Sequence, residues 1–191
     1  PGGTASYPSS VLMNDIPGLK VGSQFEPVPG HPGVAALRLT ILRKRVEAGI
    51  AVNNQGNGQL GTTQATVNLV ANSLLRQGER TQLVFGAPVT IRRYQYYGFS
   101  HVEPLGYDGA TLTFGYGRLV TQPQSNAAAG SADTFTIRLS YPVIRAVRET
   151  LVLNADLNAL NSNAAYLGQA LADERTRSAR IGAPATGVNV R

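Results

Sequence analysis

The sequence of 191 residues contains no cysteine, which excludes a disulfide-stapled secreted domain and any thiolate metal site. Its two histidines, His31 and His101, are too few for a metal cluster. Charged residues make up only 15% of the chain, whereas a soluble domain carries about a quarter. Nowhere do about eighteen apolar residues follow one another, so the sequence excludes a transmembrane helix.

Uncharged polar residues supply most of the polarity of the chain. Threonine, serine, asparagine, glutamine and 21 glycines take the place of charge. This composition is typical of a protein with one side in lipid and a hydrated, uncharged interior. Only helices and closed barrels satisfy every backbone polar group in lipid. Because an apolar helix is excluded, a membrane protein of this composition must be built from β-strands.

Apolar and polar residues alternate with a period of two along much of the chain, which predicts β-strands. The apolar stripes lie in residues 48–52, 65–71, 83–91, 112–116, 135–141 and 151–159. The runs are each roughly ten residues long, the length that a tilted strand needs to cross a bilayer. Soluble strands are shorter, commonly about five or six residues. Alternation alone leaves a soluble β-sandwich open, but strand length favours a mainly β, antiparallel transmembrane β-barrel.

The polar residues between the stripes are predicted to face a hydrated lumen: Gln64, Thr66, Asn68, Thr111, Thr113, Arg138, Asn154, Asp156 and Asn158. Arg138 and Asp156 stand in the middle of strands, where a hydrated lumen tolerates charge. Several tyrosines lie near expected strand ends, as an interfacial aromatic girdle requires: Tyr94, Tyr96, Tyr97, Tyr107 and Tyr141.

Two kinds of connection alternate along the predicted barrel. Residues 53–61 and 122–131 are long, polar and rich in glycine, asparagine or serine, as loops are. Residues 76–79, 104–109 and 145–149 form tighter turns with proline, glycine and charge. This alternation is typical of a barrel with long external loops and short periplasmic turns.

The N-terminal portion, residues 1–45, differs from the rest. Residues 9–15 are predicted to end a short helix, which Pro17 and Gly18 terminate. Two strands, 21–27 and 35–44, follow with a turn between them. A helix and a hairpin form part of a small α+β unit, so we place a domain boundary near Arg45. Residues 46–191 are then a barrel segment of about seven or eight strands.

Motifs in consistent order along the chain resemble the two-partner-secretion outer-membrane transporters, the TpsB or haemolysin-activator family of the Omp85 superfamily. The similar segments are NDIPGLKVGSQFEPVPGHPGVAALRLTI (14–41), Asn53-Asn54-Gln55-Gly56 with Gly61, Asn72-Ser73-Leu74-Leu75 with Gly78-Glu79, Tyr107-Asp108-Gly109, LSYPVIRAVRETLVLNADL (139–157) and 173–178. In that family the first of these segments is the end of a POTRA domain, which leads directly into the barrel.

The resemblance implies an outer-membrane transporter with its N-terminal part in the periplasm. Such a protein recognises an unfolded secreted partner through the POTRA domain and passes it outward without a cofactor. Strand addition to a sheet edge is the expected mode of recognition, with Val21, Ser23 and Phe25 on the candidate edge strand. The family's first POTRA domain, inserted loop and closing strands have no counterpart here. We therefore expect the C-terminal part of a POTRA domain and the N-terminal half of a barrel.

Other functions fit the sequence less well. A related Omp85-type assembly factor is the main alternative, and a soluble β-rich binding module is the next. Residues 56–61 match G-x-G-x-x-G, but a strand is expected after them instead of the helix that a dinucleotide site needs. Ser100 and His101 are adjacent and would point to opposite faces of a strand, so no hydrolytic triad and no enzyme activity are expected.

The chain carries a net charge of +6, with a pI near 10. Its arginines are scattered over expected turns and strands and do not form one patch, so we expect no nucleic-acid partner. The expected partners are the secreted protein and outer-membrane lipid, with no small-molecule substrate. Arginines in the lumen would attract anions and give weak channel activity.

Overall fold

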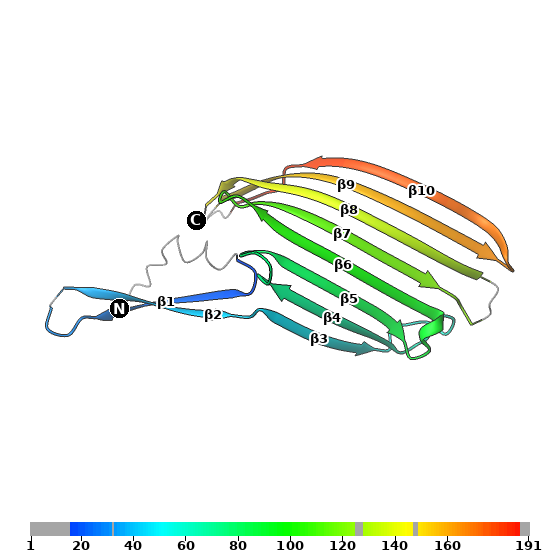
Figure 1. Ribbon diagram of the computed structural model, residues 1–191, viewed down its shortest axis with the longest axis horizontal. Helices are drawn as coiled ribbons and strands as arrows, with labels where there is room; N and C mark the ends of the chain where they lie inside the picture. Colours follow the sequence, from blue (N-terminus) through cyan, green and yellow to red (C-terminus); the bar gives the residue numbers. More distant parts are fainter. Residues whose placement is uncertain (1–15, 32, 125–127, 147–148, 188–191) are drawn as a thin grey trace.

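The structure, a computed structural model, describes residues 16–31, 33–124, 128–146 and 149–187. Two antiparallel sheets account for most of them (Figure 1). The first is a hairpin of β1 (Leu19–Pro27) and β2 (Ala35–Arg43). The second contains β3 (Val46–Asn53), β4 (Gln64–Asn72), β5 (Arg80–Pro88), β6 (Tyr94–Leu105), β7 (Ala110–Thr121), β8 (Ala128–Arg145), β9 (Glu149–Tyr166), β10 (Gln169–Gly182) and β11 (Ala185–Gly187).

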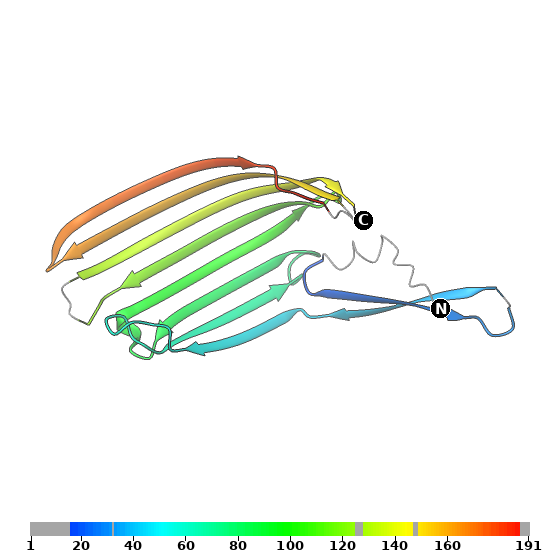
Figure 2. The same ribbon diagram turned by 180° about the vertical axis from the view of Figure 1, so that it is seen from behind.

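The large sheet is an antiparallel meander. Strands β3 to β10 lie side by side in chain order, and each pairs with the next. Figures 1 and 2 show a curved sheet from whose β3 side the β1–β2 hairpin projects. In the described part of the chain, no helix has the length and apolar character needed to cross a membrane. The helix predicted at residues 9–15 lies outside the described residues.

Strand length grows along the sheet. β3 has 8 residues, β6 has 12, and β8 and β9 have 18 each. Strands and pairing follow the predicted alternation, but several predicted boundaries are wrong. The stripe at 83–91 ends as a strand at Pro88, and the short 3-10 helix η1 (Ile91–Arg93) follows. The predicted loop at 122–131 is shorter, because β8 starts at Ala128.

Prolines mark two of the irregularities of the longest strands, since proline cannot donate to the ladder. The register of β8 against β9 shifts between Pro142 and Ile144. Pro184 separates β10 from β11, and both strands pair with β9. The Val152 amide donates to the Pro184 carbonyl at 3.1 Å, so the ladder resumes directly after the break.

The turn between β9 and β10 contains two residues with positive φ. Leu167 has φ 50° and Gly168 has φ 79°, which are the backbone conformations of a type I′ hairpin turn. The sequence motif at 173–178 predicted a strand start there, but the tight turn lets β10 begin at Gln169. At the same end of the sheet, the Gln124 amide donates to the Gln59 carbonyl at 3.0 Å and links two of the longer connections.

The large sheet has almost no apolar core of its own. Among the residues that the structure describes, the buried hydrophobic ones are Val21, Val70 and Ala87. Large apolar side chains are exposed instead along β3 to β10, for example Ile50 at 75%, Leu83 at 49% and Leu157 at 57%. The hydrophobic effect within this chain therefore does not explain where these side chains lie, and an exposed apolar surface of this size marks a site of contact with another apolar surface.

Candidate functional site

The register sorts the side chains of the large sheet into two faces. One row of paired residues runs across it through Val70, Gln82, Ser100, Gly115, Thr136, Asn158 and Ser178. We call the face that carries this row the polar face and the opposite one the apolar face. All the residues predicted to face the lumen share the polar face: Gln64, Thr66, Asn68, Thr111, Thr113, Arg138, Asn154, Asp156 and Asn158. That this face lines a lumen stays a prediction.

Cross-strand hydrogen bonds join neighbouring side chains on the polar face. Gln82 Nε2 donates to Asn68 Oδ1 at 2.8 Å. Thr136 Oγ1 lies 3.0 Å from Asn158 Oδ1, to which it donates. Arg138 forms an ion pair with Asp156 on the adjacent strand. Amides and hydroxyls therefore dominate this part of the face, and Asp156 neutralises Arg138.

Tyrosine side chains also lie on the polar face, which corrects part of the predicted aromatic girdle. A Cβ atom placed on Gly98 would lie 3.1 Å from the Tyr96 hydroxyl, so the Tyr96 ring covers this glycine. The Tyr94 ring lies near Gly86 in the same way. Because they alternate with Tyr97 along β6, Tyr94 and Tyr96 point away from the apolar face.

The remaining girdle residues divide between a strand face and a turn. Tyr97 and Tyr141 do lie on the apolar face, 42% and 46% exposed. Tyr107 lies in the β6–β7 turn, outside the strands. The girdle prediction is wrong for Tyr94 and Tyr96, because nearness to a strand end does not fix the face on which a side chain lies.

The central row of the apolar face is hydrophobic across almost the entire sheet. It runs through Ala48, Leu69, Leu83, Phe99, Tyr116, Phe135 and Ala159, and it ends at Arg177. Tyr116 and Phe135 contact each other with ring centroids 4.9 Å apart. Leu69, Leu83, Phe99 and Phe135 of this row are between 40% and 49% exposed. The row is a continuous, uncovered apolar band.

Each of the two flanking rows contains polar residues, but on different strands. The row nearer the β1–β2 hairpin starts with the apolar Val46 and Ala71 and is polar at Thr81 and His101. It is apolar again at Phe114, Ile137, Leu157 and Ala179. The row farther from the hairpin starts with Ile50, Val67, Phe85 and Tyr97, and becomes polar at Arg118, Asp133, Asn161 and Arg175. The apolar band therefore crosses the strands obliquely.

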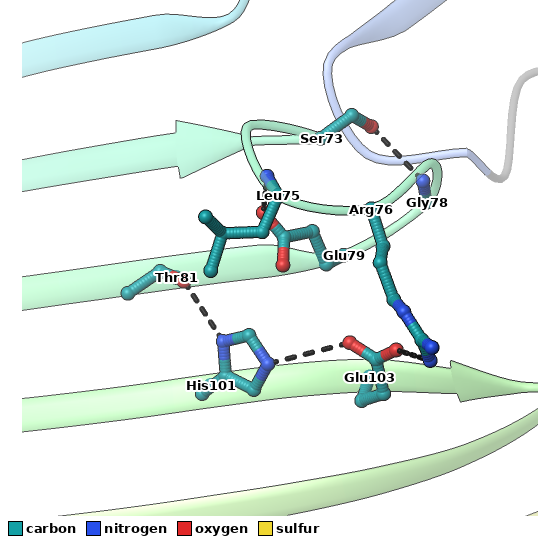
Figure 3. A network of polar contacts seen from close by, with 8 residues as sticks. All are labelled: Ser73, Leu75, Arg76, Gly78, Glu79, Thr81, His101 and Glu103. Atoms are coloured by element: carbon teal, nitrogen blue, oxygen red, sulfur yellow. Dashed lines mark hydrogen bonds and ion pairs between the residues drawn. The ribbon is translucent and has the colours of Figure 1, made fainter.

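A polar network closes the band at the rim nearer the hairpin (Figure 3). Thr81 Oγ1 lies 2.8 Å from His101 Nδ1, and His101 Nε2 lies 3.4 Å from a Glu103 carboxylate oxygen. Arg76 reaches the other oxygen of Glu103 at 3.1 Å. The network connects the β4–β5 turn to β5 and β6, so it fixes the turn against the sheet.

The β4–β5 turn is also closed by its own side chains. Glu79 is 2% exposed, and its carboxylate accepts a hydrogen bond of 2.7 Å from the Leu75 amide. Ser73 Oγ accepts another, at 3.0 Å, from the Gly78 amide. Figure 3 shows both contacts around one compact loop. The motif around 72–79 is therefore a structural clasp.

Three groups of this rim could in principle hold a cation. Glu79, His101 and Glu103 each offer one ligand atom, and these atoms lie within 4.8 Å of one another. Counting histidines alone missed the arrangement, because Glu79 and His101 are distant in sequence and meet only through strand pairing. The Leu75 amide and Arg76 already engage the two carboxylates, so the clasp explains the cluster without a metal.

Asn72 ties the hairpin to the sheet. Its side chain is 2% exposed and donates to the Lys44 carbonyl at 3.1 Å and to Glu47 at 3.2 Å. Lys44 in turn donates its amide to the Gly18 carbonyl at 2.7 Å. A Cβ atom on Gly18 would lie 2.3 Å from the Lys44 carbonyl and 2.7 Å from Asn72 Cβ. One buried amide thus fixes the start of β1 against the junction of β2 with β3.

The predicted partner-binding residues share one face of β1. Val21, Ser23 and Phe25 pair with residues of β2 in an unbroken register. Val21 is 8% exposed, whereas Phe25 is 48% exposed. The structure describes a hairpin here, and the assignment of residues 1–45 to a POTRA domain stays a prediction.

The motifs considered for other chemistry have structural explanations in the described residues. Ser100 and His101 lie on opposite faces of β6, as expected for neighbours in a strand. Asp133 accepts hydrogen bonds from Tyr116 at 2.7 Å and from Arg118 at 3.3 Å. The glycines of 56–61 lie in a connection that leads into strand β4, not into a helix.

A curved antiparallel meander with one apolar and one polar face is the wall of a β-barrel membrane protein. A scan against protein-family models finds no match, and neither does a comparison with curated proteins. Two solved structures, both named CdiB, share this fold, in agreement with the fold that the sequence resemblance implies. CdiB from Escherichia coli matches with a TM-score of 0.72 and 17% identity, over 95% of this chain and 35% of that one.

The second structure gives the same result. CdiB from Acinetobacter baumannii matches with a TM-score of 0.61 and 14% identity, over 93% of this chain and 36% of that one. The chain thus spans about a third of the length of both CdiB structures. At this level of identity the likeness establishes the fold, and the predicted mainly β, barrel-type architecture is confirmed.

Proposed function

We propose that the chain forms part of the wall of an outer-membrane transporter, which passes an unfolded secreted protein of the haemolysin or adhesin type across the bacterial outer membrane. One observation carries the proposal: the large apolar side chains of the sheet share an exposed face, and a polar face lies behind it. A soluble monomer rarely exposes so large an apolar patch. A bilayer would cover this face and leave the other one hydrated.

The oblique course of the band supports a bilayer over another protein as its cover. Neighbouring strands lie about 4.8 Å apart, and strands of outer-membrane barrels are tilted by about 40°. A row of paired residues then rises roughly 3 Å per strand, or roughly 20 Å from β3 to β10. An apolar band is about 25 Å tall. The polar end of the farther row, at Arg118, Asp133, Asn161 and Arg175, follows from this geometry.

The same geometry indicates on which side of the membrane each end of the sheet lies. Thr81, His101 and Glu103 lie at the rim nearer the hairpin, which we place in the periplasm. Asp133 and Arg175 lie where the longest strands rise out of the band, which we place at the cell surface. The increase in strand length toward β8 and β9 extends the wall beyond the lipid at this side.

We assign the polar face to the translocation path. Its amides and hydroxyls offer hydrogen bonds to a passing backbone, and the Arg138–Asp156 pair adds no net charge. Such a surface is suited to an extended chain of varied sequence, because it selects neither for one charge nor for one side chain. The chemistry supports passage of a polypeptide, with no reaction on it.

Recognition of the partner is assigned to the N-terminal part. We place residues 1–45 in the periplasm as the C-terminal part of a POTRA domain. Strand addition at the hairpin would use β1, with Val21, Ser23 and Phe25 beside the incoming chain. The exposed aromatic ring of Phe25 supports this assignment.

The test uses the full-length protein that contains this chain in its native host. Deleting its gene should abolish secretion of the large protein encoded beside it and leave the other outer-membrane proteins unchanged. A general loss of outer-membrane proteins would identify an assembly factor instead. Recovery of the protein in the soluble periplasm, without heat-dependent gel mobility, would contradict both.

A pair of variants in β9 tests the assignment of faces. Asn158→Trp places a bulky side chain on the polar face, whereas Leu157→Trp places the same side chain on the apolar face. Secretion should fall severalfold in the first variant and stay near the wild-type level in the second, with heat-dependent mobility retained in both. Equal secretion from the two folded variants would remove the polar face from the path.

A further inference from the structure

A shallow groove lies on the apolar face of the last strands. It has a volume of about 440 Å³ and is lined by Phe135, Ile137, Leu157, Ala159, Ala179 and Arg177, together with Asn158 and Ser178. The two alanines leave room between larger neighbours, since Ala159 pairs with Arg177 and Ala179 pairs with Leu157. The lining of the groove is therefore mainly hydrocarbon and contains a single arginine.

A polar hollow of about 290 Å³ adjoins the groove. Its lining includes Asp133, Asn161, Asn163, Asp173, Arg175 and Arg177. Arg177 belongs to both hollows, with apolar residues on one side of it and polar residues on the other. Together they have the shape and polarity of a site for an amphiphile.

The charges of this polar hollow are paired, with one exception. Asp133 lies 3.3 Å from Arg118, and Asp173 lies 3.8 Å from Arg175. Arg177 has no acidic partner among the ion pairs of the described residues, so one positive charge remains uncompensated at the end of the groove.

Neutral oxygens hold the Arg177 guanidinium in place. Nη1 donates to the carbonyls of Leu160, at 3.0 Å, and Thr176, at 2.8 Å, and Nη2 donates to Asn161 Oδ1 at 2.7 Å. A guanidinium carries five N–H donors. The N–H groups beyond these three bonds remain for an anion, and the fixed orientation presents them without further loss of rotamer freedom.

We propose that this groove and Arg177 bind an outer-leaflet lipid with a phosphorylated headgroup, its acyl chain in the groove and its phosphate on the guanidinium. This inference rests on the proposed function, which places this end of the sheet at the cell surface. The central apolar row ends at Arg177, so the guanidinium lies at the depth of the headgroups. Arginine also matches the geometry of phosphate with paired hydrogen bonds.

Native mass spectrometry of the detergent-purified full-length protein tests the site. The probe is a bisphosphorylated lipid A, compared with the same lipid after removal of its phosphates. Arg177→Gln should lower retention of the phosphorylated lipid about tenfold, the loss expected for one charge-assisted contact. The dephosphorylated lipid should bind the wild type and this variant equally.

Arg180→Gln is the matched control, because Arg180 lies on the same strand and pairs with Asp156 on the polar face. It should retain the lipid at the wild-type level. Ala159→Phe fills the groove and should lower retention of both lipid forms while Arg177 remains. Equal retention by Arg177→Gln and Arg180→Gln would overturn the proposal, as would displacement of the lipid by an equal concentration of inorganic phosphate.

The outcomes also separate this inference from the proposed function. All variants are first checked for heat-dependent gel mobility and for secretion of the partner. A folded, secreting protein in which Arg177→Gln retains the lipid would overturn only the lipid site. If the protein shows neither heat-dependent gel mobility nor secretion of the partner, the proposed transporter function is contradicted, and the lipid site with it.

Discussion

Single residues at the junction of hairpin and sheet carry much of the local order. Gly18 has φ +74° and lies directly against the Lys44 carbonyl and Asn72. Both features require glycine, since a Cβ atom is disfavoured at this φ and has no room here. Asn72 then closes the same junction from the sheet side through its two hydrogen bonds. The geometry of this joint therefore depends on one missing side chain and one amide.

Replacing Gly18 tests this dependence. Gly18→Ala should destabilise the junction more than Gly30→Ala, because Gly30 has a similar φ of +82° but open space around it. The control variant is expected to cost about 1–2 kcal/mol from backbone strain alone. Limited proteolysis of the hairpin and urea unfolding of the full-length protein in detergent measure the two effects. Equal losses of stability in the two variants would show that close packing at Gly18 contributes nothing to the stability of the junction.

Asn72 provides a second test at this scale. Asn72→Ala should cost about 1–3 kcal/mol, because Glu47 and the Lys44 carbonyl lose a buried donor. Asn72→Asp should cost at least as much, since it places a second carboxylate beside Glu47. Urea unfolding of the full-length protein compares the variants. A stable Asn72→Asp variant would contradict the role of Asn72 as a donor.

At the scale of elements, the face of the sheet on which a residue lies determines which substitutions its position tolerates. Leu83 and Gln82 are neighbours on β5, yet Leu83 belongs to the central apolar row and Gln82 to the polar one. The difference comes from the two-residue period of the strand. The difference does not come from depth in the membrane, because Leu83 and Gln82 are adjacent in the strand.

An arginine at each of these positions measures the difference. Leu83→Arg should lower the free energy of unfolding by about 2–4 kcal/mol if the central row lies in lipid. Gln82→Arg should change it by less than about 1 kcal/mol, since its side chain stays hydrated. Urea titrations in lipid vesicles give both values. A larger loss at Gln82 would reverse the assignment of the faces.

At the scale of the whole molecule, the proposed place of the sheet in a bilayer requires its strands to be tilted. Val67 and Asn161 belong to one row of paired residues, but the first lies in the apolar band and the second beyond it. This difference has no explanation if the rows run parallel to the membrane plane. With tilted strands, the row leaves the bilayer as it crosses the sheet.

Cysteine labelling tests this geometry, because the chain has no cysteine of its own. In intact cells, Asn161→Cys should react with a membrane-impermeant thiol reagent, whereas Val67→Cys should be protected. The full-length protein without these substitutions gives the background. Equal labelling at the two positions would contradict the tilt and the position of the band.

The sequence by itself determined the secondary structure type, the faces and the family resemblance. Alternation such as that around Leu153 and Asn154 follows from the two-residue period of a strand, so a face can be assigned without coordinates. The ends of strands were harder to predict, as at Ala128 and Gln169. Turn geometry such as positive φ at Leu167 depends on how the flanking strands pair, and a single sequence does not show this.

Only the tertiary structure decided which residues of distant strands meet. Three features each combine side chains from separate strands or turns. They are the cluster of Glu79, His101 and Glu103, the junction at Asn72, and the groove that contains Arg177. Pairing register creates these contacts, and register is a property of the whole sheet. The sequence could show that one face is apolar, but the depth at which the band begins and ends became visible only when the rows were aligned.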